Sequence, residues 1–150
     1  MIRHAFTVAE VNAMLPRIRR AAEQVKRYSR RLNRLSDDLY VDNRPEVDTL
    51  VDQGYMDGIT QVIEGVELIG EMGGEIKDLS QGLVDFPSHY EGRTVLLCWK
   101  PGEERFGHWH DPEDGFSGRS PIEDEADFEG DPQDEFRLEG DIEADDSNLA

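Results

Sequence analysis

A stripe of small and apolar side chains runs through residues 18–39, with spacings that alternate between four and three positions. At 100° per residue these positions fall on one narrow face of an α-helix, and the arginines between residues 19 and 34 fall on the rest. The pattern therefore predicts a long amphipathic helix with an apolar seam and a basic back. The seam comprises Ile18, Ala22, Val25, Ser29, Leu32, Ser36 and Leu39.

The start of this helix is marked at Thr7. Thr7 and Glu10 have the spacing of a capping box, in which each side chain accepts a hydrogen bond from the other residue's backbone amide. Pro16 deletes an amide donor inside the helical pattern. We therefore expect either a kink at Pro16, or a short helix to Leu15 and a second helix that begins at Pro16.

A second helical pattern runs from about residue 46 to about residue 72, after a turn at 42–45. It is acidic where the first is basic, so the two helices are expected to pair as an antiparallel hairpin. Each internal glycine costs about 1 kcal/mol relative to alanine, which suggests close approach to a partner helix or a local break. These glycines are Gly54, Gly58, Gly65 and Gly70.

Two helices alone cannot cover both apolar stripes, so a further layer is needed: a β unit, a second chain, or both. We expect the hairpin to bind a second copy of the chain or another protein. The residues expected at this interface are Ile18, Val25, Leu32, Leu39, Val51, Ile59, Val62 and Val66.

From residue 75 the helical period gives way to short apolar runs between turn residues. Strands are expected at 75–79, 83–86, 93–100 and 105–110. The acids and glycines after residue 122 predict a disordered acidic tail at 123–150. The expected fold class is α+β: a long antiparallel helical hairpin followed by a small antiparallel β-sheet, in a single domain over residues 1–122.

The formal net charge of −18 argues against indiscriminate nucleic-acid binding, which needs cations on the protein. Cys98 is the single cysteine, so neither an intramolecular disulfide nor an all-cysteine zinc cage can form within one chain. No run approaches the roughly 20 apolar residues of a membrane span, and the N-terminus lacks the apolar core of a signal peptide. We expect a soluble cytoplasmic protein with no membrane partner.

Several motifs resemble those of a known family. They are FTVAEVNAMLP at residues 6–16, LVDFP at 83–87, LCWKPGE at 97–103 and GRSPI at 118–122. Together they are similar to the small prokaryotic proteins of the domain-of-unknown-function 2203 family, over about residues 5–122. The resemblance implies a compact helical-plus-β protein. It implies no activity and no catalytic residues.

Polar and reactive side chains gather in the β unit. His108 and His110 share one face of an expected strand, where two metal ligands can sit, and are the candidate ligands of a divalent metal ion. Asp85, Glu103 and Arg119 are the candidate ligand-binding residues around them. The alternative is that the histidines satisfy backbone or carboxylate partners at the sheet edge.

The position of Cys98 relative to these histidines depends on the turn after Lys100. If this turn contains an even number of loop residues, Cys98 lies on the opposite face of the sheet from both histidines. If the turn is bulged and contains an odd number, Cys98 and the histidines share one face. Trp99 and Trp109 are expected to be core residues on opposite faces. Taken alone, Cys98 is interpreted as a buried small hydrophobe rather than a nucleophile.

Two functional hypotheses follow. The first is a non-enzymatic interaction or scaffold protein that self-associates through the hairpin. The alternative is a metal- or small-molecule-binding protein, with or without catalytic activity, that uses the polar cluster of the β unit.

Overall fold

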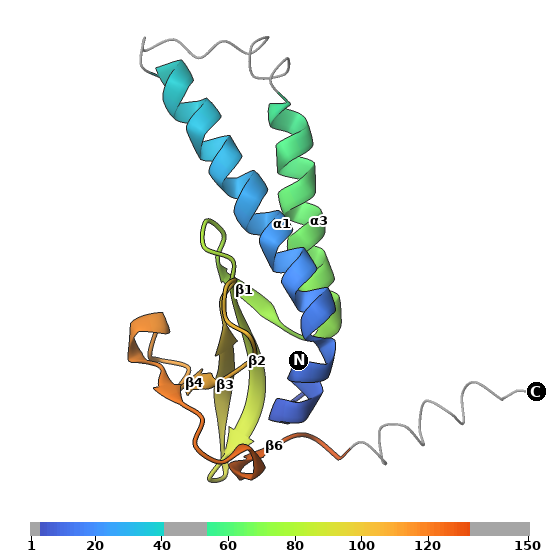
Figure 1. Ribbon diagram of the computed structural model, residues 1–150, viewed down its shortest axis with the longest axis vertical. Helices are drawn as coiled ribbons and strands as arrows, with labels where there is room; N and C mark the ends of the chain where they lie inside the picture. Colours follow the sequence, from blue (N-terminus) through green and yellow to red (C-terminus); the bar gives the residue numbers. More distant parts are fainter. Residues whose placement is uncertain (1–3, 41–53, 133–150) are drawn as a thin grey trace, which may run out of the picture.

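The computed structural model describes residues 4–40 and 54–132, with the side chains of residues 38–40 left aside. A pair of helices, α1 (Val8–Tyr40) and α3 (Tyr55–Met72), leans against one face of an antiparallel sheet (Figure 1). Its strands are β1 (Glu75–Asp78), β2 (Leu83–Tyr90), β3 (Arg93–Trp99), β4 (His108–His110), β5 (Ser120–Pro121) and β6 (Phe128–Glu129). Two short 3-10 helices, η1 (Phe116–Gly118) and η2 (Glu125–Asp127), lie in the connections. The expected α+β class is confirmed.

The capping box at the start of α1 is confirmed. The Thr7 amide donates to Glu10 Oε1 over 2.8 Å, and the Glu10 amide donates to Thr7 Oγ1 over 3.1 Å. The alternative of two helices divided at Pro16 is wrong, because α1 continues through it. Pro16 lies on the exposed side of the helix, while Leu15 and Ile18 on either side of it are buried in the core. That burial offsets the missing hydrogen bond.

Two of the four helix glycines bring α3 against α1. A Cβ at Gly65 would lie 2.5 Å from Val25 Cγ2, and a Cβ at Gly58 would lie 2.8 Å from Leu32 Cδ2. Gly54 instead precedes α3 in a left-handed conformation, and a Cβ at Gly70 would meet nothing within 4 Å. Close approach of α3 to α1 is thus confirmed at Gly58 and Gly65. The expected turn at 42–45 and the start of the second helix lie outside the described residues.

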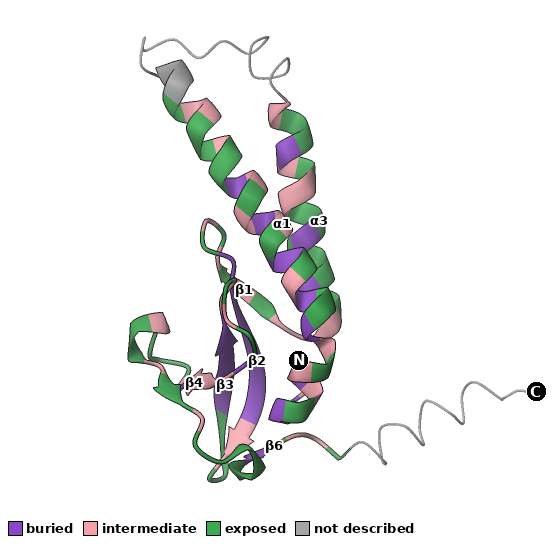
Figure 2. Ribbon diagram, in the orientation of Figure 1, coloured by how far each residue is buried: buried purple, intermediate pink, exposed green. Residues whose placement is uncertain are grey.

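The residues expected at a hairpin interface differ in how far they are buried within the chain. Ile18 and Val25 are fully buried within the chain, and Leu32 packs on α3. Burial is densest in β2, β3 and the lower half of the helix pair (Figure 2). On α3, Ile59 and Val62 are half-buried and Val66 is exposed. Val51 and the Leu39 side chain lie outside the described part of the chain.

The sheet runs in the order β1-β2-β3-β4-β5, and β6 pairs with the far end of β2. The predicted strand at 83–86 was too short, because β2 continues through Pro87 to Tyr90. The carbonyl of Pro87 accepts from the Phe6 amide, so its nitrogen points toward that same edge of β2. The edge is open there between β1 and β6, so no ladder hydrogen bond to β3 is lost.

One face of the sheet forms the core with the helices. Its central side chains are Val84, Phe86, Val95, Leu97 and Trp99. Trp109 pairs with Leu97 and therefore shares the face of Trp99, so the expectation of opposite faces was wrong. The predicted strand at 105–110 is confirmed only from His108, since Phe106 turns into the core instead.

The fold extends past the predicted tail boundary at residue 123. Phe128 is 3% exposed in the core, and β6 pairs with His89 and Tyr90 of β2. The Asp131 carboxylate accepts from the Ala5 amide over 2.9 Å, and the Asp131 amide donates to Ala5 O. The boundary was wrong because a single aromatic residue within an acidic run fills a core position. Residues 133–150 lie outside the described residues.

Candidate functional site

The candidate site lies on the outer face of the sheet, away from the helices. Cys98 pairs directly with Asp85 on one side and with His108 on the other, so these side chains share that face. Leu96 pairs with His110, which places the second histidine on the same face, two residues further along β4. The loop between Cys98 and His108 therefore holds an odd number of residues, the case that brings the cysteine and the histidines together.

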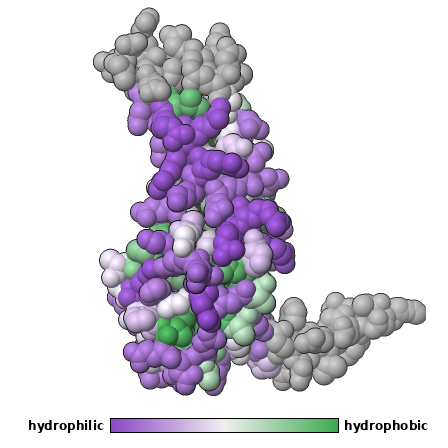
Figure 3. Space-filling model, in the orientation of Figure 1, coloured by the Kyte–Doolittle hydropathy of each residue, from purple (hydrophilic) through white to green (hydrophobic). Residues whose placement is uncertain are grey.

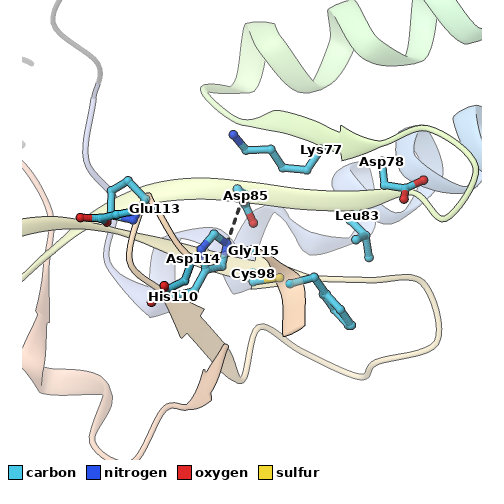
Figure 4. Close-up of a pocket in the computed structure, with 11 residues that line it drawn as sticks. Lys77, Asp78, Leu83, Asp85, Cys98, His110, Glu113, Asp114 and Gly115 are labelled. Atoms are coloured by element: carbon cyan, nitrogen blue, oxygen red, sulfur yellow. Dashed lines mark hydrogen bonds and ion pairs between the residues drawn. The ribbon is translucent and has the colours of Figure 1, made fainter. Parts of the chain in front are cut away.

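Asp85, Cys98 and His110 form a buried cluster at the floor of a cavity (Figure 4). One ligand atom from each lies within 4.8 Å of the others, and the three residues are 2%, 1% and 5% exposed. They come from β2, β3 and β4, so the sheet ladder fixes their separation. Figure 4 shows the His110 ring and the Asp85 carboxylate pointing toward each other, with the sulfur of Cys98 beside them.

Both ring nitrogens of His110 have partners. Nδ1 lies 2.8 Å from the carbonyl oxygen of Asp111, which can only accept, so Nδ1 carries a proton. Nε2 lies 3.1 Å from Asp85 Oδ2, and that contact also needs a proton between the two atoms. The pair is therefore either an imidazolium beside a carboxylate or a neutral imidazole beside a carboxylic acid. In both forms it holds one proton that a cation can replace.

Burial governs the two acidic groups of the cluster. It raises the pKa of Asp85, and the neighbouring His110 and Lys77 lower it in part. Burial, with the charge of Asp85 second, raises the pKa of the Cys98 thiol to about 12. No nitrogen of His110 is left to deprotonate this thiol. The arrangement therefore does not fit a cysteine nucleophile activated by a histidine base.

The ligand types and spacing suit a divalent transition metal. Two atoms bound to tetrahedral zinc at about 2.0 Å lie about 3.3 Å apart, close to the 3.1 Å between His110 Nε2 and Asp85 Oδ2. The proton on His110 Nδ1, donated to a backbone carbonyl, is the outer contact that orients ligating histidines. A carboxylate, a thiolate and a neutral imidazole around a divalent ion sum to zero charge, which suits a buried site.

A cavity of about 370 Å³ lies over this cluster. Lys77 and Leu83 line it from the β1–β2 side. Residues 112–115 line it from the loop before η1, and Phe116, the first residue of η1, also contributes. A metal ion held by these three residues would keep a fourth coordination position toward the cavity for water or a ligand, as in zinc sites that keep an open position.

The predicted residues divide between two clusters. Asp85 and His110 meet as expected, whereas His108 does not join them: its buried Nδ1 has no hydrogen-bond partner among the described residues and lies 3.9 Å from Glu103 Oε2. Glu103 and Arg119 form a two-point ion pair on the other side of Cys98. The Arg119 guanidinium also lies 4.2 Å above the Phe116 ring and 3.8 Å from Cys98 Sγ.

Sequence reasoning missed two contributors to the site. The sequence favours Cys98 as a buried small hydrophobe, and only the alternative of an odd loop places it beside a histidine. Lys77 was not singled out at all. Its position at the cavity follows from strand alternation, because Lys77 lies on the same face of β1 as Glu75, which pairs with Asp85.

Comparisons with known proteins agree with the sequence motifs. The family model described as "Uncharacterized conserved protein (DUF2203)" matches residues 4–122. No curated protein and no solved structure matches the chain. Among the described residues no helix is long and apolar enough to cross a membrane. The chain belongs to the family of uncharacterized conserved proteins DUF2203.

Proposed function

We propose that this protein binds a divalent transition-metal ion, with zinc as the best match, through Asp85, Cys98 and His110. The observation that carries the proposal is the buried cluster itself, in which His110 Nε2 lies 3.1 Å from Asp85 Oδ2 beside Cys98, a contact that requires a proton between the two atoms. A metal ion takes the place of that proton and of the thiol proton of Cys98. It thereby replaces a costly buried polar contact with coordination bonds.

The test uses Co²⁺ as a spectroscopic substitute for zinc. Metal-free protein titrated with Co²⁺ is expected to show d–d bands of a four-coordinate ion and a thiolate-to-cobalt charge-transfer band, and Zn²⁺ should displace both. Cys98→Ser should abolish the charge-transfer band, and His110→Gln should weaken cobalt binding at least tenfold. His108→Gln is the matched control, because His108 lies on the same strand and face but outside the cluster.

A protein that binds neither ion would refute the metal site. A charge-transfer band that survives in Cys98→Ser would also refute the site, because the band would then not arise from the Cys98 thiolate. Circular dichroism of each variant separates loss of a ligand from loss of the fold.

A second function, self-association through the helical pair, is supported by a different observation. One face of α3 carries apolar or small residues at spacings of three, four, three and four, the period of helix–helix seams. Met56 and Ile63 on it are 59% and 51% exposed, and Val66 is 38% exposed. The set is Met56, Ile59, Ile63, Val66 and Gly70.

The occupant we propose for this face is a second copy of the chain. The surface over α1 is hydrophilic in the view of Figure 3, and its exposed arginines complement the acids that flank the apolar face of α3. Sedimentation equilibrium should find a dimer at micromolar concentration. Ile63→Glu should convert it to a monomer, whereas Leu79→Glu, at an exposed apolar residue of the β1–β2 connection, should not. A monomeric wild-type protein would remove this function.

A further inference from the structure

Two cavities on the outer face of the sheet adjoin each other. The first, of about 370 Å³, covers the Asp85–Cys98–His110 cluster, and the second, of about 510 Å³, lies toward the other end of β2 and β3. Lys77 and Pro112 line both cavities, so the two lie side by side and share a boundary at these residues. The two cavities together are called the trough. Its volume is in the range of small-molecule sites.

The period of the strands explains the lining of the trough. Alternate residues of β2 and β3 point to the outer face, so each strand contributes every second side chain to the floor. The floor of the second cavity comprises Pro87, His89, Thr94 and Leu96. Its centre is apolar, at Pro87, Leu96 and Pro112, while the metal-site cluster forms the polar end of the first cavity.

Most carboxylates around the trough already have partners. Asp131, at the end of the second cavity, accepts from the Ala5 amide and contacts His4 and His89. Asp78 accepts from Ser80 Oγ and from the Gln81 amide, which fixes the β1–β2 turn. Glu113 and Asp114 are exposed on the outer rim.

Lys77 is the cation at the junction of the two cavities. Its Nζ lies 3.3 Å from Glu75 Oε1, in a pair whose side chains are 44% and 51% exposed. An ion pair this open to water contributes little stability, so Lys77 can turn toward an anion in the trough at small cost. With the proposed metal ion bound, the trough would offer an open coordination position, an adjacent ammonium group and an apolar channel.

We infer that the trough binds a small monocarboxylate with an apolar body, an inference that rests on the metal site proposed above. The carboxylate takes the open position on the metal and meets Lys77. The body lies beneath Pro112 and over Leu96 and Pro87, toward Thr94. Cys98 and Thr94 stand four residues apart on β3, roughly 13 Å at 3.3 Å per residue, so a chain of about eight carbons is well matched to the channel.

The test measures how straight-chain carboxylates from acetate to octanoate perturb the spectrum of the cobalt-loaded protein. Each buried methylene should tighten binding about fourfold until the channel is full. Octanol, which lacks the carboxylate, should bind much more weakly. Lys77→Gln should weaken every carboxylate by a similar factor and leave the chain-length dependence unchanged.

A blocking variant isolates the apolar channel. Thr94 is exposed at the far end of the trough, so Thr94→Trp fills the channel without disturbing the core. It should leave the cobalt spectrum and acetate binding unchanged and abolish the extra affinity of octanoate. Thr60→Trp, at an exposed position on α3, is the matched control.

The outcomes separate the two proposals. A normal cobalt spectrum with no dependence on chain length, or with octanoate binding unaffected by Thr94→Trp, would overturn the trough as a carboxylate site and leave the metal site standing. Absence of cobalt binding would overturn both.

Discussion

The contact of Gly65 with α1 sets a measurable cost for adding one methyl group. In Gly65→Ala the new Cβ would lie 2.5 Å from Val25 Cγ2 and 3.1 Å from the carbonyl oxygen of Ala21. Carbon atoms in contact are normally about 3.5–4.0 Å apart, so the neighbour must give by about 1 Å. Val25 is fully buried and β-branched in a helix, which leaves it one favoured rotamer. The helices must therefore separate.

Overpacking of this kind costs about 1–3 kcal/mol, whereas alanine is favoured over glycine in a helix by up to about 1 kcal/mol. We expect Gly65→Ala to lower the free energy of unfolding by about 1–2 kcal/mol. Gly70→Ala, where the new Cβ meets nothing within 4 Å, should raise it by about 0.5–1 kcal/mol. Gly58→Ala should fall between them, because the atom it meets is the end of the Leu32 side chain.

Urea denaturation of the three variants measures these differences. Since all three are Gly→Ala changes in one helix, backbone terms largely cancel in the comparison, and what remains is packing against α1. Measurements at two protein concentrations separate this effect from association through α3. Equal stabilities of Gly65→Ala and Gly70→Ala would refute the described contact between the helices.

Three further predictions concern the ends and edges of the sheet. The Ala5 amide, with His89 and His4, holds the pKa of Asp131 below its usual range. The ionised Asp131 carboxylate therefore stabilises the folded protein fully above the unfolded pKa near 3.8, and this contribution is lost as the pH falls through the folded pKa. Asp131→Asn should therefore be less stable than wild type by about 1 kcal/mol at pH 7, and a difference in stability that does not narrow as the pH falls below 3.8 would contradict this origin. Phe128→Ala should cost about 3 kcal/mol in thermal unfolding, whereas Leu79→Ala, 44% exposed, should cost little; equal effects would place residue 128 outside the core. Arg119→Lys loses the second hydrogen bond to Glu103 and the stacking on Phe116, and should cost about 1–2 kcal/mol. Arg105→Lys, in an exposed pair with Glu125, should change stability far less.

The elements that sequence alone identified are those encoded by local periodicity and capping. The Thr7–Glu10 box and the seam through Ile18 and Val25 depend on residues within a few turns of one helix. They need no knowledge of what lies opposite. The same holds for the class of fold, because the change from a helical to a strand pattern is visible at residue 75.

The candidate site depended on pairings that the sequence leaves open. Whether Cys98 joins His110 follows from the parity of one loop, which no residue type in that loop decides. Asp85 could be placed near the histidines only as a candidate, because its partner stands 25 positions away. The ordered strand at Phe128 was missed for the same reason, since its partner Tyr90 lies far away in the chain.

The pairing of β6 with β2 has a consequence for how the chain is synthesised. Residues 1–122 leave the ribosome with the place of Phe128 vacant, so the Tyr90 and Trp109 rings that pack on it stay uncovered. The native fold closes only when residue 131 has emerged and bonds back to Ala5. For that interval the nascent protein presents an aromatic surface, and a pause in translation shortly after residue 122 would prolong its exposure to chaperones and to aggregation.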